Sequence, residues 1–346
     1  MTTNYLEVVA INSHASIQDL GRVHSQHLGF SASGAADEYA FLSANKLIAE
    51  HRHSLNPKKS QLNCAAIEIT LGQISFQAHG DCLIAITGAD CQAKINNLAV
   101  SNWQCLQLNA GDIIEFTMPK AGLHSYLAIA GGVQLQENQQ PWLGSFSQTT
   151  NEVALGFSGK PLTKASKVYF KPAAFITSEL TNAATSVIPN SQMSKPIPQQ
   201  FYATQTLTLR FIASPLFLKM TAAMQKQWLS SSYSISADSN RMGYRLHLQN
   251  PDNTSTNKPI LSGVLRASCR LSKPVCYGMI QLPANEEPII LMKERQTMGG
   301  YPVLGTVMTT DLFRLSQMRP GAKVNFSIIN VQQAQQQLRA FYQRFS

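Results

Sequence analysis

The chain has 346 residues, of which 44% are hydrophobic and only 14% charged. That length predicts about two domains, and the hydrophobic share excludes global disorder. The formal net charge of +9 belongs to the C-terminal part, because residues 1–205 sum to −1 and residues 206–346 to +10. Such an excess suits a small anion, an acidic partner, an acidic membrane, nucleic acid or simply a solvated basic face.

Several classes of protein are excluded by what the sequence lacks. No apolar run approaches the roughly 18 residues of a membrane span, and the first residues do not resemble a signal peptide. The six cysteines form no C-x-x-C pair and no zinc-type cluster, so we expect reduced thiols and a cytoplasmic protein. No basic run interleaved with aromatic residues points to nucleic acid.

Short apolar runs separated by Gly, Asn and Asp dominate the chain and predict a mainly β fold. Examples are the runs at 83–86, 113–116 and 125–130. Three helices are expected, at Ala36–Glu50, Pro215–Leu229 and Val331–Phe345. The carboxylate of Asp37, near the start of the first helix, interacts favourably with the helix dipole. Residues 51–63 are expected to form a polar loop.

The polar stretch at about 177–206 lacks periodicity and predicts a linker. We therefore expect an N-terminal lobe over 1–205 that ends in this linker, and a basic C-terminal lobe over 206–346 that ends in a helix. No metal site is expected, since His24 and His27 have no third ligand and the histidines at 51 and 53 fit a solvated loop.

Four segments mix glycine with polar residues, a pattern that lets a ligand approach backbone N–H groups. The segment that runs from Gly29 into a helix N-terminus suits a carboxylate or phosphate. None of the four fits the P-loop, the dinucleotide fingerprint or the nucleophile elbow. These segments lie at 16–22, 29–37, 239–245 and 295–302.

Taken in order, these and further motifs resemble the KipA-like family, also described as allophanate hydrolase subunit 2-like or biotin-dependent carboxyltransferase-like. The resemblance runs from about Ile11 to Phe326. The matching motifs are IQDLGR at 17–22, SGAAD at 33–37, IEITLG at 67–72, ITGAD at 86–90, YLAIAGGV at 126–133, LGS at 143–145, SNRMGYRL at 239–246, GMIQLP at 278–283 and QTMGGYP at 296–302.

This resemblance implies two cyclophilin-like β-barrel lobes with a few flanking helices. It also implies the C subunit of an ATP-dependent 5-oxoprolinase, which opens the 5-oxoproline lactam to L-glutamate. The implied partners are a KipI-like (PxpB-like) B subunit and a LamB/YcsF-type (PxpA-like) A subunit. ATP would act at the level of the complex, and no biotinyl-lysine motif is present, because Lys293 lacks the usual flanking residue.

Two alternatives stay open. The first is a carboxyltransferase-like enzyme that acts on a urea or amide substrate with a separate biotin carrier. The second is a KipA-like regulator that binds a KipI-like protein without turnover. We expect neither nucleic acid nor a membrane as a partner, and both enzyme hypotheses require charge to be stabilised on an amide oxygen.

The matching positions supply the candidate site residues, whose individual roles the resemblance does not define. Carboxylates suit a base, and arginines and amides suit an oxyanion, a carboxylate or a phosphate. The catalytic candidates are Asp19, Asp37, Glu68, Arg241 and Gln296. The substrate-binding candidates are Gln18, Arg22, Ser33, Asn45, Tyr244, Arg245, Gln281, Thr297, Gly299, Gly300 and Tyr301.

The sequence departs from the family pattern in the C-terminal lobe. Proline stands at 274 where glycine is usual, tyrosine at 277 where proline is usual, and methionine at 298 where threonine is usual. Proline also forbids the positive φ that glycine provides. Residues 265–270 look inserted. These changes bear on the identity of the substrate.

Overall fold

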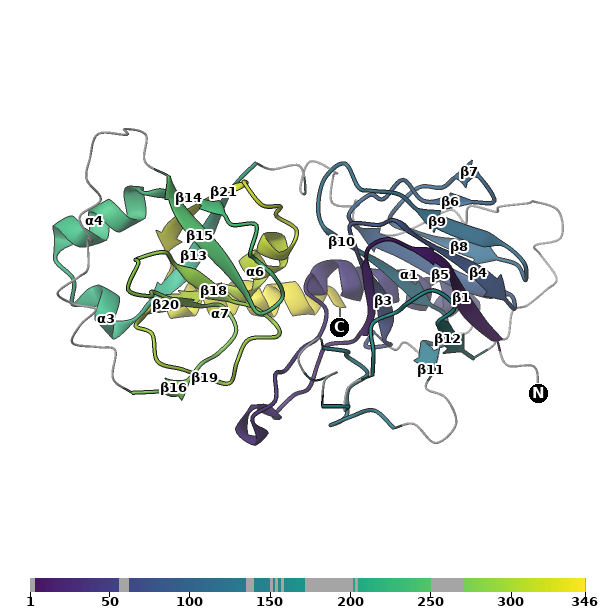
Figure 1. Cartoon of the computed structure of the whole chain (residues 1–346), viewed down its shortest axis with the longest axis horizontal. Helices are drawn as coiled ribbons and strands as arrows, with labels where there is room; N and C mark the ends of the chain where they lie inside the picture. The colour runs from purple at the N-terminus through teal and green to yellow at the C-terminus, as the bar shows by residue number, and fades with distance from the viewer. Residues whose placement is uncertain are drawn as a thin grey trace. The chain divides into compact units, whose positions relative to one another are not determined.

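The computed structural model describes residues 4–55, 62–134, 140–149, 152, 155–156, 159–171, 202, 205–249 and 271–345, without the side chains of 52–55. The chain divides into two compact units (Figure 1). The first consists of Met1–Arg22 and Ser33–Ala203 together with Phe345, and the second of Val23–Ala32 and Thr204–Arg344. Residues 23–32 therefore pack with the second unit, although they lie early in the sequence.

Two sheets make up the first unit. The seven-stranded sheet has the order β11 (Val133–Gln134), β12 (Lys167–Phe170), β1 (Asn4–Ile11), β4 (Ile74–His79), β9 (Ile113–Phe116), β6 (Lys94–Ile95) and β7 (Leu98–Ala99). The five-stranded sheet has the order β2 (His14–Gln18), β3 (Ala66–Thr70), β10 (His124–Ile129), β5 (Cys82–Gly88) and β8 (Gln104–Leu108). Their inner faces share one apolar core, to which Leu6, Ile67, Phe76 and Ile84 belong.

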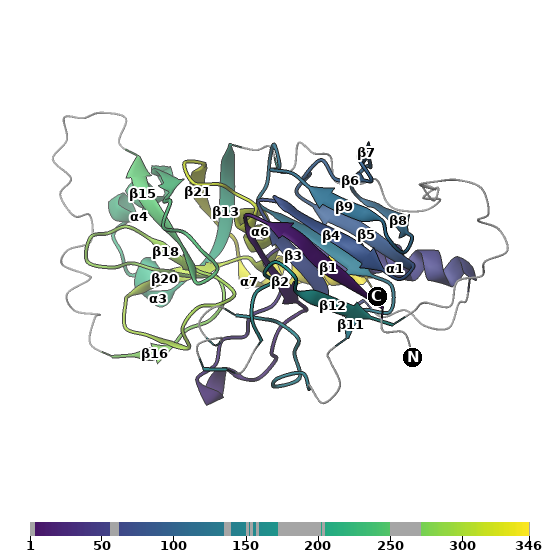
Figure 2. The ribbon, with the colours of Figure 1, turned by 45° about the vertical axis from the view of Figure 1, so that its right-hand side comes forward.

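Helix α1 (Glu38–Leu55) covers the outer face of the five-stranded sheet (Figures 1 and 2). Strands β5 and β10 are consequently buried on both faces, and each contains an uninterrupted apolar run, at 82–86 in β5 and 127–129 in β10. Thr87 on β5 donates a hydrogen bond to the carbonyl of Ala40 on α1. The helix continues to Leu55, so the polar loop expected over 51–63 is wrong for residues 51–55, and residues 56–61 lie outside the described residues.

A closed seven-stranded barrel forms the second unit. Around the barrel the order is β13 (Thr206–Ala213), β20 (Val303–Val307), β17 (Met279–Gln281), β18 (Ile289–Leu291), β15 (Gly243–Gln249), β14 (Ser232–Ile235) and β21 (Lys323–Ile328). Alternate residues such as Leu207, Leu209 and Phe211 on β13 point into its core. A separate pair of strands joins β16 (Lys273–Pro274) to β19 (Met298–Gly299).

Described helices of the second unit are α3 (Pro215–Leu218), α4 (Ala222–Ser230), α6 (Thr309–Ser316) and α7 (Val331–Tyr342). The single helix expected over 215–229 is wrong, because Thr221 starts a new helix by accepting a hydrogen bond from the Met224 N–H. The expected C-terminal helix is confirmed as α7, followed by one 3-10 turn (Gln343–Phe345).

The mainly β fold with few helices is confirmed, and the closed barrel lies in the second unit. In the part of the first unit that the structure describes, the strands form two sheets that share one core. The lobe boundary at 205 stays a prediction. Most of the expected linker at 177–206 and the insertion at 265–270 lie outside the described residues.

Candidate functional site

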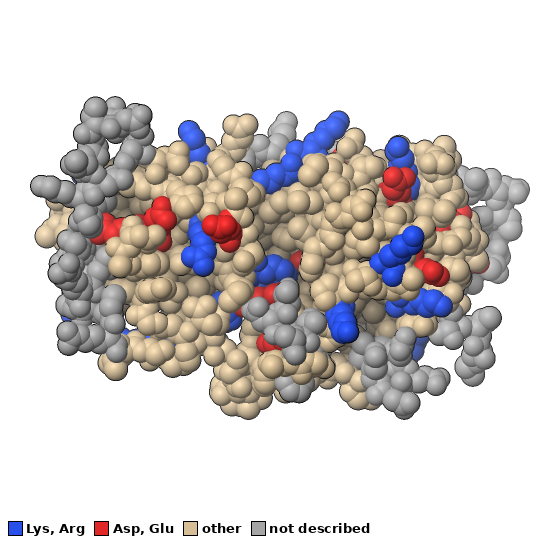
Figure 3. Space-filling model, viewed as in Figure 1, with Lys and Arg blue, Asp and Glu red and all other residues tan. Residues whose placement is uncertain are grey.

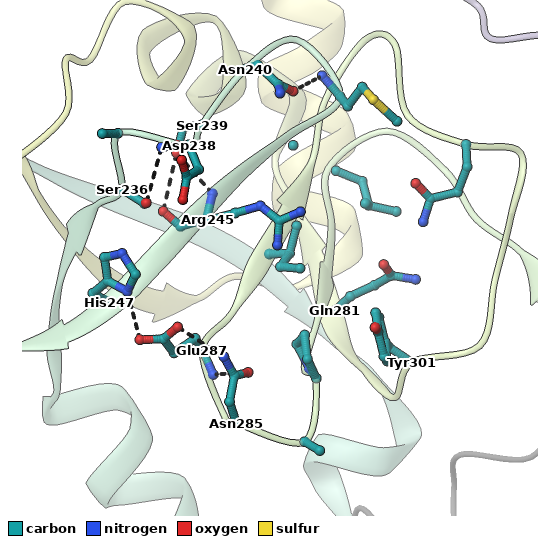
Figure 4. A pocket seen from close by; sticks show the side chains of 18 residues that line it. Ser236, Asp238, Ser239, Asn240, Arg245, His247, Gln281, Asn285, Glu287 and Tyr301 are labelled. Carbon is teal, nitrogen blue, oxygen red and sulfur yellow. Dashed lines mark hydrogen bonds and ion pairs between the residues drawn. The ribbon is translucent and has the colours of Figure 1, made fainter. Parts of the chain in front are cut away.

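A pocket of about 1040 Å³ opens on the outer face of the barrel in the second unit (Figure 4). Strands β15, β17 and β18 form its floor, and the segments 236–242, 283–287 and 296–301 surround it. Four residues predicted from the sequence line it, namely Arg245, Gln281, Gln296 and Tyr301.

Strand alternation explains which residues face the pocket. On β15, Tyr244 and Leu246 enter the barrel core, so Arg245 and His247 project outward. Arg245 pairs with Ile289 on β18, and Ile289 pairs in turn with Gln281 on β17. The floor therefore carries a cation and an amide with an apolar residue between them, their Cα atoms roughly 10 Å apart.

Two further rows flank this central row. On one side Gly243 pairs with Leu291, which makes that edge apolar. On the other side the same register, continued by two residues, sets His247 opposite Glu287. The pocket thus has a polar edge and an apolar edge on either side of the line from Arg245 to Gln281.

Arg245 extends into the middle of the pocket (Figure 4). Its backbone N–H donates to the hydroxyl of Ser239, and its carbonyl accepts from the Ser236 N–H, so the strand beneath it is fixed. Among the described residues, no hydrogen bond or ion pair engages its guanidinium group. A ligand carboxylate or phosphate therefore meets a preplaced cation there.

The opposite end of the pocket carries Gln281, Gln296 and Tyr301. Gln281 is 1% exposed, and within the described structure its amide nitrogen has no hydrogen-bond partner. That nitrogen lies so close to Gly299 that a Cβ added there would be 2.4 Å from it. Gln296 and Tyr301 are exposed and offer further donors.

His247 and Glu287 were missed by the sequence analysis. The His247 Nδ1 atom lies 2.7 Å from a carboxylate oxygen of Glu287, and the second oxygen accepts from the Asn285 side chain at 3.0 Å (Figure 4). The alternation of apolar and polar residues along 244–247 could have indicated that His247 shares a face with Arg245. Its pairing with Glu287, 40 residues later in the chain, has no local signal.

The other candidates of this unit do not line the pocket. Arg241 donates through Nε to Glu294 at 2.5 Å, and the backbone carbonyl of Arg241 accepts from the Glu294 N–H. Tyr244 belongs to the barrel core and donates to the Ser316 carbonyl. The Thr297 carbonyl accepts from the Gln26 side chain and the Val275 N–H. Gly300 is exposed, with open space around its Cα.

The segment between β18 and the pocket buries three consecutive charged residues, Lys293, Glu294 and Arg295. Lys293 Nζ lies 4.8 Å from the ring centroid of Tyr277, a cation–π geometry. Arg295 donates to the Gln26 side chain, and burial lowers the pKa of its guanidinium group. These contacts fix the base of the loop that carries Gln296 and Tyr301.

Two of the three departures from the family pattern belong to one strand pair. Pro274 on β16 faces Met298 on β19, and the ladder between these strands keeps its register. Tyr277, the third departure, lies under the ammonium group of Lys293. All three residues are outside the pocket lining but adjoin the segment 296–301.

In the first unit, Asp19 and Arg22 form one buried cluster. The Asp19 carboxylate accepts from the N–H groups of Gly21 and Phe146 and from the hydroxyls of Ser145 and Ser147. Arg22 donates to the Ser147 carbonyl, lies over the Trp142 ring at 4.5 Å and faces Glu152 at 3.6 Å. Both side chains hold residues 142–147 and Glu152 close to the end of β2.

Asp37 and Glu68 belong to a second buried cluster, at the start of α1. Asp37 accepts from the Ala40 N–H and from the Tyr202 hydroxyl, while Glu68 accepts from the Ala36 N–H and the Tyr126 hydroxyl at 2.8 Å. Burial, reinforced by the nearby carboxylates, raises the pKa of both tyrosines well above their usual range. The tyrosines thus remain protonated donors to the carboxylates.

The remaining candidates of the first unit are also buried. Gln18 donates to the Ser16 hydroxyl and to the Gln148 carbonyl, and Ser33 donates to Gln18 at 3.5 Å. Asn45 donates from α1 to the carbonyls of Phe41 and Cys64. A second pocket of about 500 Å³ in this unit contains none of the predicted site residues.

Other chemistries find little support in the described residues. There, no group of three or more His, Cys, Asp or Glu side chains is arranged to hold a metal ion. Of the helices that the structure describes, none is long and apolar enough to cross a membrane. Burial raises the pKa of the Cys82 and Cys105 thiols to about 12, so both stay protonated and unreactive.

Comparison with known proteins identifies the family. The family model for the carboxyltransferase domain, subdomain A and B, matches residues 28–328. The chain belongs to this family. It is 28% identical to the C subunit of 5-oxoprolinase from Escherichia coli over 98% of this chain and 97% of that protein. It is 27% identical to the C subunit of 5-oxoprolinase from Haemophilus influenzae over 95% of this chain and 93% of that protein.

More distant members are parts of longer proteins. Urea amidolyase of Saccharomyces cerevisiae is 26% identical over 93% of this chain but only 16% of its own length. The crystal structure of Kluyveromyces lactis urea amidolyase superposes with a TM-score of 0.76 at 21% identity and covers 99% of this chain and 20% of that one. At that identity the superposition supports the fold alone.

Proposed function

We propose that this carboxyltransferase-family chain is the C subunit of an ATP-dependent 5-oxoprolinase. The observation that carries the proposal is the near end-to-end match to the C subunits of 5-oxoprolinase from two bacteria. The urea amidolyases match over a similar share of this chain but over only about a sixth of their own length. The reaction would open the lactam of 5-oxoproline to L-glutamate, driven by ATP hydrolysis.

The pocket on the barrel suits this substrate. 5-Oxoproline carries a carboxylate at one end and an amide carbonyl at the other, as the floor carries Arg245 at one end and Gln281 at the other. Arg245 would pair with the carboxylate, and the amide nitrogen of Gln281, with Gln296 and Tyr301 beside it, would donate to the carbonyl oxygen, where negative charge develops. The two ring methylenes would lie toward the apolar edge formed by Gly243 and Leu291.

Asp19, Asp37 and Glu68 are assigned positioning roles in this proposal. Each is buried and already accepts hydrogen bonds from its own unit, which suits the support of a loop better than proton transfer to a substrate. Arg241, held by Glu294, and Gly299, packed on Gln281, would position the pocket rather than contact the substrate.

ATP and the partner proteins enter at the level of the complex. The sequence contains no P-loop, so we assign ATP binding to the complex rather than to a motif of this chain. We propose a KipI-like B subunit and a LamB/YcsF-type A subunit as partners, and a cytoplasmic complex. Turnover would therefore depend on all three chains.

A carboxyltransferase-like activity is the second candidate, favoured by the family description and by the urea amidolyase relatives. A urea-type substrate would bring an amide but no carboxylate to the pocket, which leaves Arg245 without a partner. A separate biotin carrier would also be required, because Lys293 is buried against Tyr277.

The test is reconstitution with the two proposed partner proteins. ATP-dependent glutamate release from 5-oxoproline is measured with all three chains and with this chain left out. The proposal expects turnover only with this chain present. Equal turnover without it would reject the proposal, while carboxyl transfer from added carboxybiotin to urea would favour the second candidate.

A further inference from the structure

We propose that His247 accepts the proton of the substrate's amide N–H, with Glu287 holding its imidazole ring in place. This inference rests on the proposed function and adds the proton acceptor of the reaction. It is carried by the arrangement of three side chains on the polar edge of the pocket, His247, Glu287 and Asn285.

The carboxylate fixes the state of the ring. An ionised carboxylate can only accept hydrogen bonds, so the proton between His247 Nδ1 and Glu287, 2.7 Å apart, resides on Nδ1. The neutral ring then presents a lone pair on Nε2. Asn285 holds Glu287 from both sides, because its amide nitrogen donates to the carboxylate and its oxygen accepts from the Glu287 N–H. The imidazole is therefore oriented by an anchored partner.

The position of the ring matches the substrate. In 5-oxoproline the amide nitrogen is bonded to the carbon that bears the carboxylate. Arg245 and His247 are successive outward residues of β15, about 7 Å apart along the strand. A carboxylate on Arg245 and a carbonyl directed toward Gln281 leave two orientations of the ring. The orientation that packs the methylenes on apolar Leu291 turns the N–H edge toward His247.

The proposed step balances without a further reactant beyond ATP. The lactam nitrogen gives its proton to His247 Nε2, and the electron pair of the N–H bond forms a C=N bond. The carbonyl oxygen takes the former C=O π electrons and forms a bond to the γ-phosphorus of ATP, while the bond from that phosphorus to ADP breaks. ADP leaves with that electron pair, and the lactam carbon is left activated for attack by water.

A second histidine–carboxylate pair provides a matched control. His79 lies 3.3 Å from Glu7 in the first unit, and both side chains are about as exposed as those of His247 and Glu287. His79 stacks on Tyr5 and lines neither pocket described above. Loss of His79 removes a histidine–carboxylate pair, and its stacking on Tyr5, without touching the proposed chemistry.

The experiment compares the reconstituted wild-type complex with complexes carrying His247→Ala, His247→Asn or His79→Ala. We expect kcat for glutamate release to fall about 10²–10⁴-fold in both His247 variants. Added imidazole should restore turnover to His247→Ala, where it can occupy the vacated space, and His79→Ala should behave as wild type. Size-exclusion chromatography checks that each complex assembles.

The outcomes separate the two proposals. A wild-type complex without turnover would reject the proposed function and this inference with it. An active wild-type complex in which the His247 variants match His79→Ala would overturn the inference alone. Lost turnover in an assembled His247→Ala complex that imidazole does not restore would also overturn the role as proton acceptor.

Discussion

Gly299 shows how a single residue can shape the pocket. It packs against the amide of Gln281, which is buried and, within the described residues, has no acceptor for its amide nitrogen. A buried amide without its hydrogen bond costs about 1–3 kcal/mol, so its retention there suggests a part in binding. The neighbouring Gly300 has open space at the position of a Cβ and offers a direct comparison.

Gly299→Ala is predicted to raise KM for 5-oxoproline while Gly300→Ala leaves it unchanged. The new Cβ at 299 would lie 2.4 Å from the Gln281 nitrogen and 3.0 Å from Val275, so the flexible amide has to move. Loss of one neutral hydrogen bond to the substrate corresponds to an increase in KM of about 3–10-fold. The measurement is steady-state kinetics of the reconstituted complex, and equal KM values for the two variants would contradict the prediction.

At the scale of elements, buried carboxylates join segments that are far apart in the sequence. Asp19, directly after β2, holds the segment 145–147 and its own loop through four accepted hydrogen bonds. Asp37 and Glu68 do the same at the start of α1. Buried polar contacts thus tie the glycine-rich motifs of the first unit to its five-stranded sheet and to the segment 145–147.

Asp19→Ala should destabilise the first unit by about 3–5 kcal/mol, because it leaves several buried donors without an acceptor. The matched control is Asp81→Ala, since exposed Asp81 accepts one hydrogen bond, from the Ala110 N–H, and should cost less than about 1 kcal/mol. Urea-induced unfolding gives both values. A midpoint for Asp19→Ala that equals that of Asp81→Ala would show that the cluster is not structural.

The strands and most helices of the chain were predictable because their signals are local. Runs such as 83–86 and 113–116 became strands β5 and β9. The break between α3 and α4 was missed, since a cap at Thr221 inside an apolar pattern looks like any other helical residue. The way the described strands of the first unit pair into two sheets depends on contacts between residues far apart in the sequence. A short sequence window does not contain that information.

The candidate site was partly predictable for the same reason. Arg245, Gln281, Gln296 and Tyr301 lie in motifs that can be read from the sequence, and the fold brings them to one pocket. Glu287 meets His247 only through the register of β15 with β18. The carboxylates of the first unit matched family motifs equally well, yet burial gives them other partners.

At the scale of the whole molecule, the structure shows where some of the excess positive charge of the C-terminal part lies. On the face shown in Figure 3, Lys and Arg side chains are scattered among uncharged residues and form no continuous basic surface in the part of the chain that the structure describes. Part of the excess is buried, as Lys293 and Arg295 are, and Arg245 faces the pocket. The position of Arg245 in the pocket and the burial of Lys293 and Arg295 suit recognition of a small anion.

The central claim is that the barrel pocket binds the carboxylate of 5-oxoproline through Arg245. The most direct test is the KM for 5-oxoproline of the reconstituted complex. Arg245→Gln is compared with Arg339→Gln, which removes the same charge from the exposed side of α7. Loss of a charge-assisted hydrogen bond costs about 1.5–3 kcal/mol, so KM is expected to rise roughly 10–150-fold in Arg245→Gln. No change in KM is expected in Arg339→Gln. Unchanged KM in Arg245→Gln would contradict the account.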